Sequence, residues 1–157
     1  MEQDWKRQVR REASEHHMCA ENRTALGSTE SKHEAVELYK ATASWALENS
    51  YPSLDTIRRH FSDCGDDGVF VDRDFEGELL ADHQVYVFHN CSGTIRVGLN
   101  IDKAIIPILH FANGCHMTVV VEGGVRVPVH IFGDNKVEAD AGCYIRKHEL
   151  KNGEHNR

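Results

Sequence analysis

The spacing of apolar residues changes its period at Gly68. Before this glycine, apolar residues recur about every three or four positions, which is typical of amphipathic helices. After it, short runs of β-branched and aromatic residues alternate with polar ones, and Asn, Asp or Gly separates the runs. A chain of 157 residues can bury one core without a disulfide or a structural metal. These patterns predict an α+β fold, with helices first and an all-β body after them.

A helical hairpin is predicted over residues 31–62. Ser31 and Glu34 form a capping box, in which the serine hydroxyl accepts from the first turn and the glutamate reaches back. Pro52 ends the first helix, because the residue before a proline avoids the helical region. Ser53 then caps a short second helix.

A β-repeat body is predicted over residues 68–147. Turn residues recur about every ten to thirteen positions, which suits either a sandwich of antiparallel strands or the rungs of a small β-solenoid. The short loops favour the solenoid, but the pattern alone leaves both arrangements open. The strands are expected at 69–71, 84–88, 94–99, 104–111, 116–121, 125–132, 136–139 and 144–146.

The two ends of the chain are polar. Residues 1–30 are expected to form an arm without a core face, which is either a frayed helix or flexible, and residues 148–157 a disordered tail. Neither a signal peptide nor a run of apolar residues that could cross a bilayer is found. The sequence therefore predicts a cytoplasmic protein that makes no membrane contact.

Net charge and cysteine content limit the kinds of partner and the oxidation state of the cysteines that we expect. The formal net charge is −7, and a negative surface repels phosphate backbones, so nucleic acid is a disfavoured partner. The 5 cysteines are widely spaced and contain no C-x-x-C pair, which favours reduced thiols. Apolar valines at 119–129 predict β strands that belong to the core or to a homo-oligomer interface.

An acidic string over residues 63–74 partly fits a calcium-binding loop. Asp63, Asp67 and Asp74 occupy the first, fifth and twelfth positions of such a loop. Gly65 lacks a ligand at the third position, and Asp74 is shorter than the usual glutamate. The alternatives are a helix exit followed by a strand, and a wider acidic cluster over 63–82 that binds a catalytic cation.

Histidines and cysteines offer a second candidate metal site. The chain has 11 histidines, and His89 and Cys91 are expected to share one face of a strand. A zinc site could then be completed across rungs by Cys115 or His130, although no cluster has the full spacing of a zinc motif. The alternative is that these side chains are ordinary core or surface residues, and no cofactor is predicted.

Two structural motifs indicate a resemblance over residues 33–146. An aromatic-proline-serine turn at 51–53 follows the first helix, and a Gly-aliphatic-aromatic-Val-Asp strand stands at 68–72. With the short β repeats that follow, the chain resembles uncharacterised small proteins of prophages and mobile elements in gut bacteria. The resemblance implies a small cytoplasmic protein encoded by a phage or mobile element, and it carries over no catalytic residue.

The sequence therefore predicts a non-enzymatic binding protein. It contains no G-x-G-x-x-G, P-loop, G-x-S-x-G or H-E-x-x-H motif, so common nucleotide-binding and hydrolase schemes have no support. A protein partner is expected, such as a component of host or defence machinery, and assembly of the protein through its β strands is an alternative. The rival hypothesis is a metal-dependent enzyme that uses the acidic cluster or the His and Cys residues.

Overall fold

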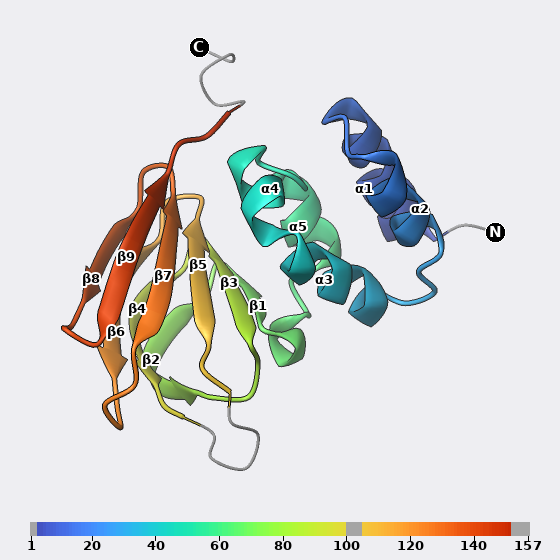
Figure 1. The fold of residues 1–157 in the computed structure, drawn as a ribbon. Helices are drawn as coiled ribbons and strands as arrows, with labels where there is room; N and C mark the ends of the chain where they lie inside the picture. The colour runs from blue at the N-terminus through green and yellow to red at the C-terminus, as the bar shows by residue number, and fades with distance from the viewer. Residues whose placement is uncertain (1–2, 100–104, 152–157) are drawn as a thin grey trace. The chain divides into compact units, whose positions relative to one another are not determined.

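A computed structural model describes residues 3–99 and 105–151 of the chain. The chain divides into two compact units, one made of Met1–Asp67 with Leu150–Arg157 and the other of Gly68–Glu149. Helices form the first unit and strands the second (Figure 1). The α+β class and the order of its two parts are therefore confirmed.

The predicted helical hairpin is present in the first unit. Ser31 caps its first helix by accepting from the Glu34 N–H at 3.2 Å, and Ser53 caps its last helix by accepting from the Thr56 N–H at 3.2 Å. The elements of this unit are α1 (Asp4–Glu15), α2 (Ala20–Gly27), α3 (Lys32–Ala41), α4 (Ala43–Glu48), α5 (Leu54–His60) and the 3-10 helix η1 (Gly65–Asp67).

Thr42 divides the first predicted helix of the hairpin into α3 and α4. Its hydroxyl donates to the Leu38 carbonyl at 3.0 Å, a local bond that competes with the backbone ladder. Its backbone leaves the helical region, with φ −114° and ψ 24°. We attribute the interruption between α3 and α4 to the Thr42 side chain, which the spacing of apolar residues does not indicate.

Residues 4–27 form helices with a buried face, which differs from the expected arm. Trp5, Val9 and Ala13 stand one turn apart on α1 and are buried, as is Leu26 on α2. The buried Tyr51 hydroxyl donates to the Val9 carbonyl at 3.0 Å. The stripe on α1 is only one residue wide per turn, so the many charged residues around it obscured the signal.

Glu12 joins α1 to the start of α5 through a buried carboxylate. The residue is 5% exposed, and the carboxylate accepts from the Ser53 N–H at 2.6 Å, from Gln8 Nε2 at 2.8 Å and from the Thr56 hydroxyl. Burial by itself raises the pKa of Glu12, but the hydrogen bonds from Thr56, Gln8 and Ser53 together lower it below its ordinary value. The charged carboxylate thus caps the N-terminus of α5.

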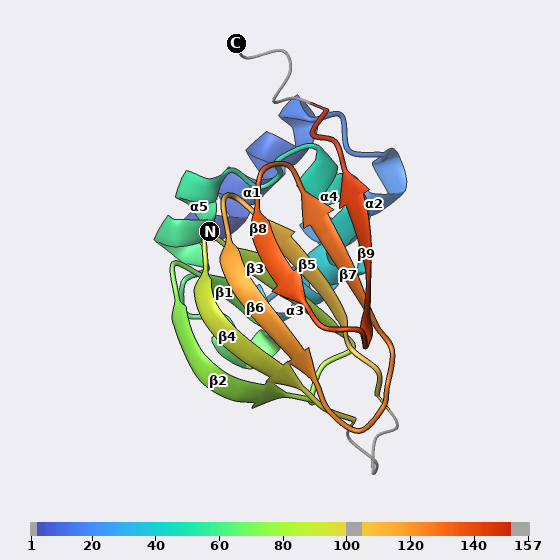
Figure 2. The same cartoon turned by 90° about the vertical axis from the view of Figure 1, so that its left-hand side faces the viewer.

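The second unit is a β-solenoid of parallel strands. Each strand pairs with the strand two further along the chain, so that one sheet has the order β1-β3-β5-β7-β9 and the other β2-β4-β6-β8 (Figures 1 and 2). Parallel pairing excludes the antiparallel sandwich. The strands are β1 (Val69–Val71), β2 (Asp74–Leu80), β3 (Val85–His89), β4 (Ser92–Val97), β5 (Ile108–Ala112), β6 (His116–Val121), β7 (Val127–Phe132), β8 (Lys136–Ala139) and β9 (Cys143–His148).

The core lies between the two sheets and is built from stacked columns of like residues. Phe88 and Phe111 are register partners on β3 and β5, and their rings stack with centroids 4.8 Å apart. Ile95 and Val119 form an equivalent buried pair on β4 and β6. Because every rung repeats the same inward positions, the core runs along the whole described stack.

A column of left-handed residues turns the chain from one sheet to the other. Asp72, Asn90 and Asn113 have φ values of 55°, 52° and 62°, a conformation that Asn and Asp tolerate better than most residues. Asn90 Nδ2 donates to Asp72 Oδ1 at 2.8 Å, which links two successive turns. The turn residues seen in the sequence therefore mark the corners of the solenoid.

Strand β2 was not predicted, because its sequence is acidic. Phe75 and Leu80 are buried, whereas Asp74, Glu76 and Glu78 are exposed. Part of the predicted acidic cluster is thus the solvent face of an edge strand. At the other end, His148 belongs to β9 rather than to a tail, and residues 152–157 lie outside the described residues, as does residue 104 of another predicted strand.

Candidate functional site

The predicted calcium loop is not formed. Gly65–Asp67 are the helix η1 and Val69–Val71 are strand β1, so the segment does not wind around a centre. Asp63 lies 3.6 Å from the Lys32 ammonium, and Asp74 accepts from the Ser92 hydroxyl at 3.1 Å. Each of these carboxylates therefore has a local partner in its own unit.

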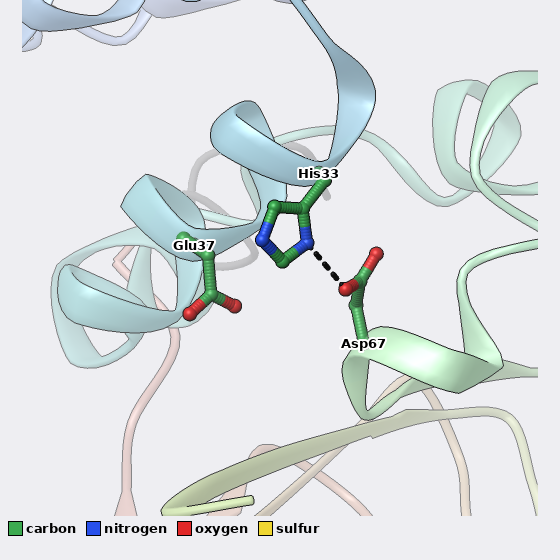
Figure 3. A group of neighbouring side chains, drawn as sticks. All are labelled: His33, Glu37 and Asp67. Atoms are coloured by element: carbon green, nitrogen blue, oxygen red, sulfur yellow. Dashed lines mark hydrogen bonds and ion pairs between the residues drawn. The ribbon is translucent and has the colours of Figure 1, made fainter.

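Asp67 instead meets two residues of α3. His33 and Glu37 stand one turn apart on this helix and point toward Asp67 on η1 (Figure 3). The His33 Nδ1 atom lies 2.6 Å from Asp67 Oδ1, and one ligand atom from each of the three residues lies within 4.8 Å of the others. Within the described residues, this His33-Glu37-Asp67 triad is the one such group of three potential ligands.

Lys40 already neutralises part of the triad. Its side chain is 8% exposed, and its ammonium lies 2.8 Å from Glu37 Oε2 and donates to the Asp67 carbonyl at 2.8 Å. These contacts hold η1 against α3 and preorganise the three ligands. They also mean that a dication must compete with an ammonium for Glu37.

The donor set suits zinc better than calcium. One imidazole nitrogen and two carboxylates leave a fourth position open, as in catalytic zinc sites, whereas calcium takes six or more oxygen ligands. His33 and Glu37 were not among the predicted ligands. Their H-x-x-x-E spacing on a helix was a usable signal, but the partner on η1 is far away in sequence.

His89 and Cys91 do not form the expected metal site. Asn90 between them is left-handed, so the alternation of a strand is broken and the two side chains do not share a face. His89 Nδ1 lies 2.8 Å from Asn113 Nδ2. Cys91 joins the core, where its N–H donates to the Cys115 sulfur at 3.3 Å. Of the predicted partners, the structure thus brings Cys115 alone to Cys91.

Three further histidines of the solenoid, His110, His130 and His148, form a column on β5, β7 and β9. The ring centroids of His110 and His130 lie 5.0 Å apart, as do those of His130 and His148. His130 Nδ1 lies 2.8 Å from His148 Nε2. Burial lowers the pKa of His110 to about 3, helped by His130 and His148, and burial with His148 and Arg146 lowers the pKa of His130. Burial and the neighbouring histidines therefore favour the neutral forms of His110 and His130.

Strand β9 is an edge strand of the solenoid that exposes two apolar side chains. It is the last strand of its sheet, and among the described strands only β7 pairs with it (Figure 1). Tyr144 is 50% exposed and Ile145 is 45% exposed. Arg146 and Lys147 follow them and are also exposed, and the Arg126 guanidinium lies 5.5 Å from the centre of the Tyr144 ring.

Strand β2, an edge of the other sheet, has the opposite character. It carries exposed Asp74, Glu76 and Glu78, and its register with β4 shifts between residues 76 and 78. Charges and bulges on an edge strand prevent the addition of further strands. β9 carries the exposed charges of Arg146 and Lys147 but no bulge, because its register with β7 is unbroken from Cys143 to His148.

No family model, no curated protein and no solved structure matches the chain. No helix in the described ranges combines the length and the apolar character that a membrane span requires.

Proposed function

We propose that the protein is a non-enzymatic binding protein that adds an extended acidic segment of a partner protein to the edge of β9. The observation that supports this function is the unbulged edge of β9 with its two exposed apolar side chains, Tyr144 and Ile145. Strand addition is a common mode of peptide recognition, in which the backbone supplies affinity and side chains supply specificity.

The backbone of β9 has donors and acceptors for such a strand. The carbonyls of Gly142 and His148 accept hydrogen bonds from β7 and the residue that follows it. In a parallel pair, alternate residues direct their N–H and C=O groups to opposite sides. The groups of Ile145 and Lys147 therefore point to the open edge.

The positive charges on β9 favour an acidic segment as the strand that is added at this edge. Arg146 and Lys147 favour carboxylates in the added strand, whereas Tyr144 and Ile145 favour apolar residues. A second copy paired through its own β9 would bring like charges together, and its β2 edge is bulged. An acidic segment of another protein thus fits better than a homo-oligomer.

Synthetic peptides test this proposal. We expect a Thr-Tyr-Val-Glu-Glu-Thr peptide at about millimolar concentration to shift the backbone amide NMR signals of Ile145 and Lys147. The charge-reversed Thr-Tyr-Val-Lys-Lys-Thr peptide should bind at least about tenfold more weakly. The double substitution Arg146→Glu and Lys147→Glu should reverse this preference, whereas Lys136→Glu on β8 should preserve it.

Two results would contradict the proposal. One is equal binding of both peptides, and the other is a set of shifted signals that excludes β9. Concentration-dependent dimerisation in sedimentation velocity, abolished by the same double substitution, would show instead that a second copy occupies the edge. The origin in a phage or mobile element, the cytoplasmic location and the host-directed role stay predictions from the resemblance and the sequence.

A zinc-dependent activity is the second candidate function, and the His33-Glu37-Asp67 triad is the observation that favours it. We expect Asp67→Asn to weaken zinc binding at least about tenfold in calorimetric titration, because the amide loses the negative charge of the ligand. Asp66→Asn changes an exposed neighbour in η1 and should leave zinc binding intact. Equal affinity of both variants and the unmodified protein would exclude the triad.

A further inference from the structure

We propose that Cys91 and Cys115 form a redox pair, in which a peroxide oxidises Cys115 and Cys91 then closes a disulfide between two rungs of the solenoid. The pair is distinct from the β9 edge and from the triad, so this inference does not rest on the proposed function. Both residues are reduced in the structure.

The two cysteines occupy the same corner of consecutive rungs. The residues that follow them, Ser92 and His116, are register partners on β4 and β6. Neighbouring parallel strands lie about 4.8 Å apart, which falls within the Cα separation that a disulfide spans. The Cys91 N–H already donates to the Cys115 sulfur at 3.3 Å. Bond formation therefore needs side-chain rotation rather than a change of fold.

Cys115 is the residue that a small oxidant reaches first. It borders a surface depression of about 480 Å³, whereas Cys91 does not. The Cys115 side chain itself is buried at 1% exposure, so only a small molecule that enters from this depression can reach the sulfur. The depression is lined by Gly114, Cys115, His116, Asp134, Asn135 and Lys136.

The pKa values of the two thiols are shifted in opposite directions. The interaction between the two side chains raises the pKa of Cys91, as does burial, and the same interaction lowers the pKa of Cys115. The Cys91 N–H also favours a Cys115 thiolate, although burial opposes it. As a thiol, Cys115 donates to the Ala112 carbonyl at 3.3 Å and to the Phe88 carbonyl at 3.4 Å. A thiolate next to a second thiol is the arrangement of redox-sensing cysteines.

The chemistry balances with hydrogen peroxide as the oxidant. The Cys115 thiolate attacks one peroxide oxygen, the O–O bond breaks, and the products are a Cys115 sulfenic acid and hydroxide. The Cys91 sulfur then attacks the Cys115 sulfur, and the leaving hydroxide takes the Cys91 proton to form water. The hydroxide released in the first step takes up the proton that Cys115 lost on ionisation, so two thiols lose two electrons and the peroxide becomes two molecules of water.

Peroxide treatment of the full chain tests the pair. We expect Cys91 and Cys115 both to escape alkylation in denaturant after the treatment, and peptide mass spectrometry to find a Cys91–Cys115 disulfide that a reductant reverses. Cys91→Ser should leave a Cys115 sulfenic acid that dimedone traps. Cys115→Ser should slow oxidation of Cys91 at least about tenfold, and Cys143→Ser should change neither result.

Two outcomes would overturn the inference. The first is a disulfide that joins Cys91 or Cys115 to a different cysteine in the unmodified protein. The second is full alkylation of both thiols after peroxide treatment, under conditions that oxidise the exposed Cys19. Both measurements use the unmodified chain, so they stand even if a substitution in the core prevents folding.

Discussion

Gly93→Ala is expected to destabilise the solenoid by at least about 4 kcal/mol, which is enough to unfold many domains of this size. Gly93 lies on β4 in register with Phe75 on β2, and its φ is +100°. A Cβ atom there would lie 2.0 Å from the Phe75 carbonyl oxygen and 2.8 Å from Asp74 Oδ1. Because the clash is with backbone of a paired strand, a rotamer change cannot relieve it. Urea denaturation followed by circular dichroism measures the loss.

Gly77→Ala is the matched control for this substitution. Gly77 on β2 has nearly the same φ, +98°, but nothing lies within 4 Å of a Cβ built on it. We expect a cost of about 1–2 kcal/mol from backbone strain alone. Equal losses for the two variants would show that the close approach of β2 and β4 is not what requires a glycine at position 93.

The second large effect is loss of stability in mild acid. Burial lowers the pKa of His89 to about 4, against a smaller opposite effect of Asp72, and burial with the neighbouring histidines lowers that of His110 to about 3. In the unfolded chain both rings bind protons below about pH 6.5. The folded protein does not bind these protons until the pH approaches 4, so its stability falls as the pH falls through this window.

The expected size follows from the number of buried rings. Each histidine removes about 1.4 kcal/mol for every pH unit below 6.5, so the free energy of unfolding should fall by about 3–4 kcal/mol between pH 7 and pH 5. Urea denaturation at the two pH values measures the difference.

Substitutions identify the histidines that cause this loss. The double substitution His89→Gln and His110→Gln should remove most of the pH dependence, even if it lowers stability at pH 7. His116→Gln changes an exposed ring on β6 and should leave the dependence as it is. A free energy of unfolding that is the same at pH 7 and pH 5 in the unmodified protein would show that the buried rings are accessible to protons when folded.

Most of the candidate site chemistry could not be predicted from the sequence. The prediction that His89 and Cys91 share a face failed because Asn90 between them is left-handed and interrupts the alternation of side chains. The approach of Cys91 to Cys115 depends on the stacking of rungs, which joins residues far apart in the chain. Asp67 was among the predicted ligands, but His33 and Glu37 on α3 were not. Which residues lie next to this face of α3 depends on how the helix packs in the folded protein.

The sequence was sufficient for those features that local interactions control. Caps at Ser31 and Ser53, the change of period at Gly68 and the turns at Asn90 and Asn113 each depend on a few neighbouring residues, and the structure contains all of them. Strand partners and register are different, because the same alternating segments can pair as a sandwich or as a solenoid. The packing of Phe88 on Phe111 between successive rungs exists only in the solenoid, and the same pairing of strands places β9 last in its sheet.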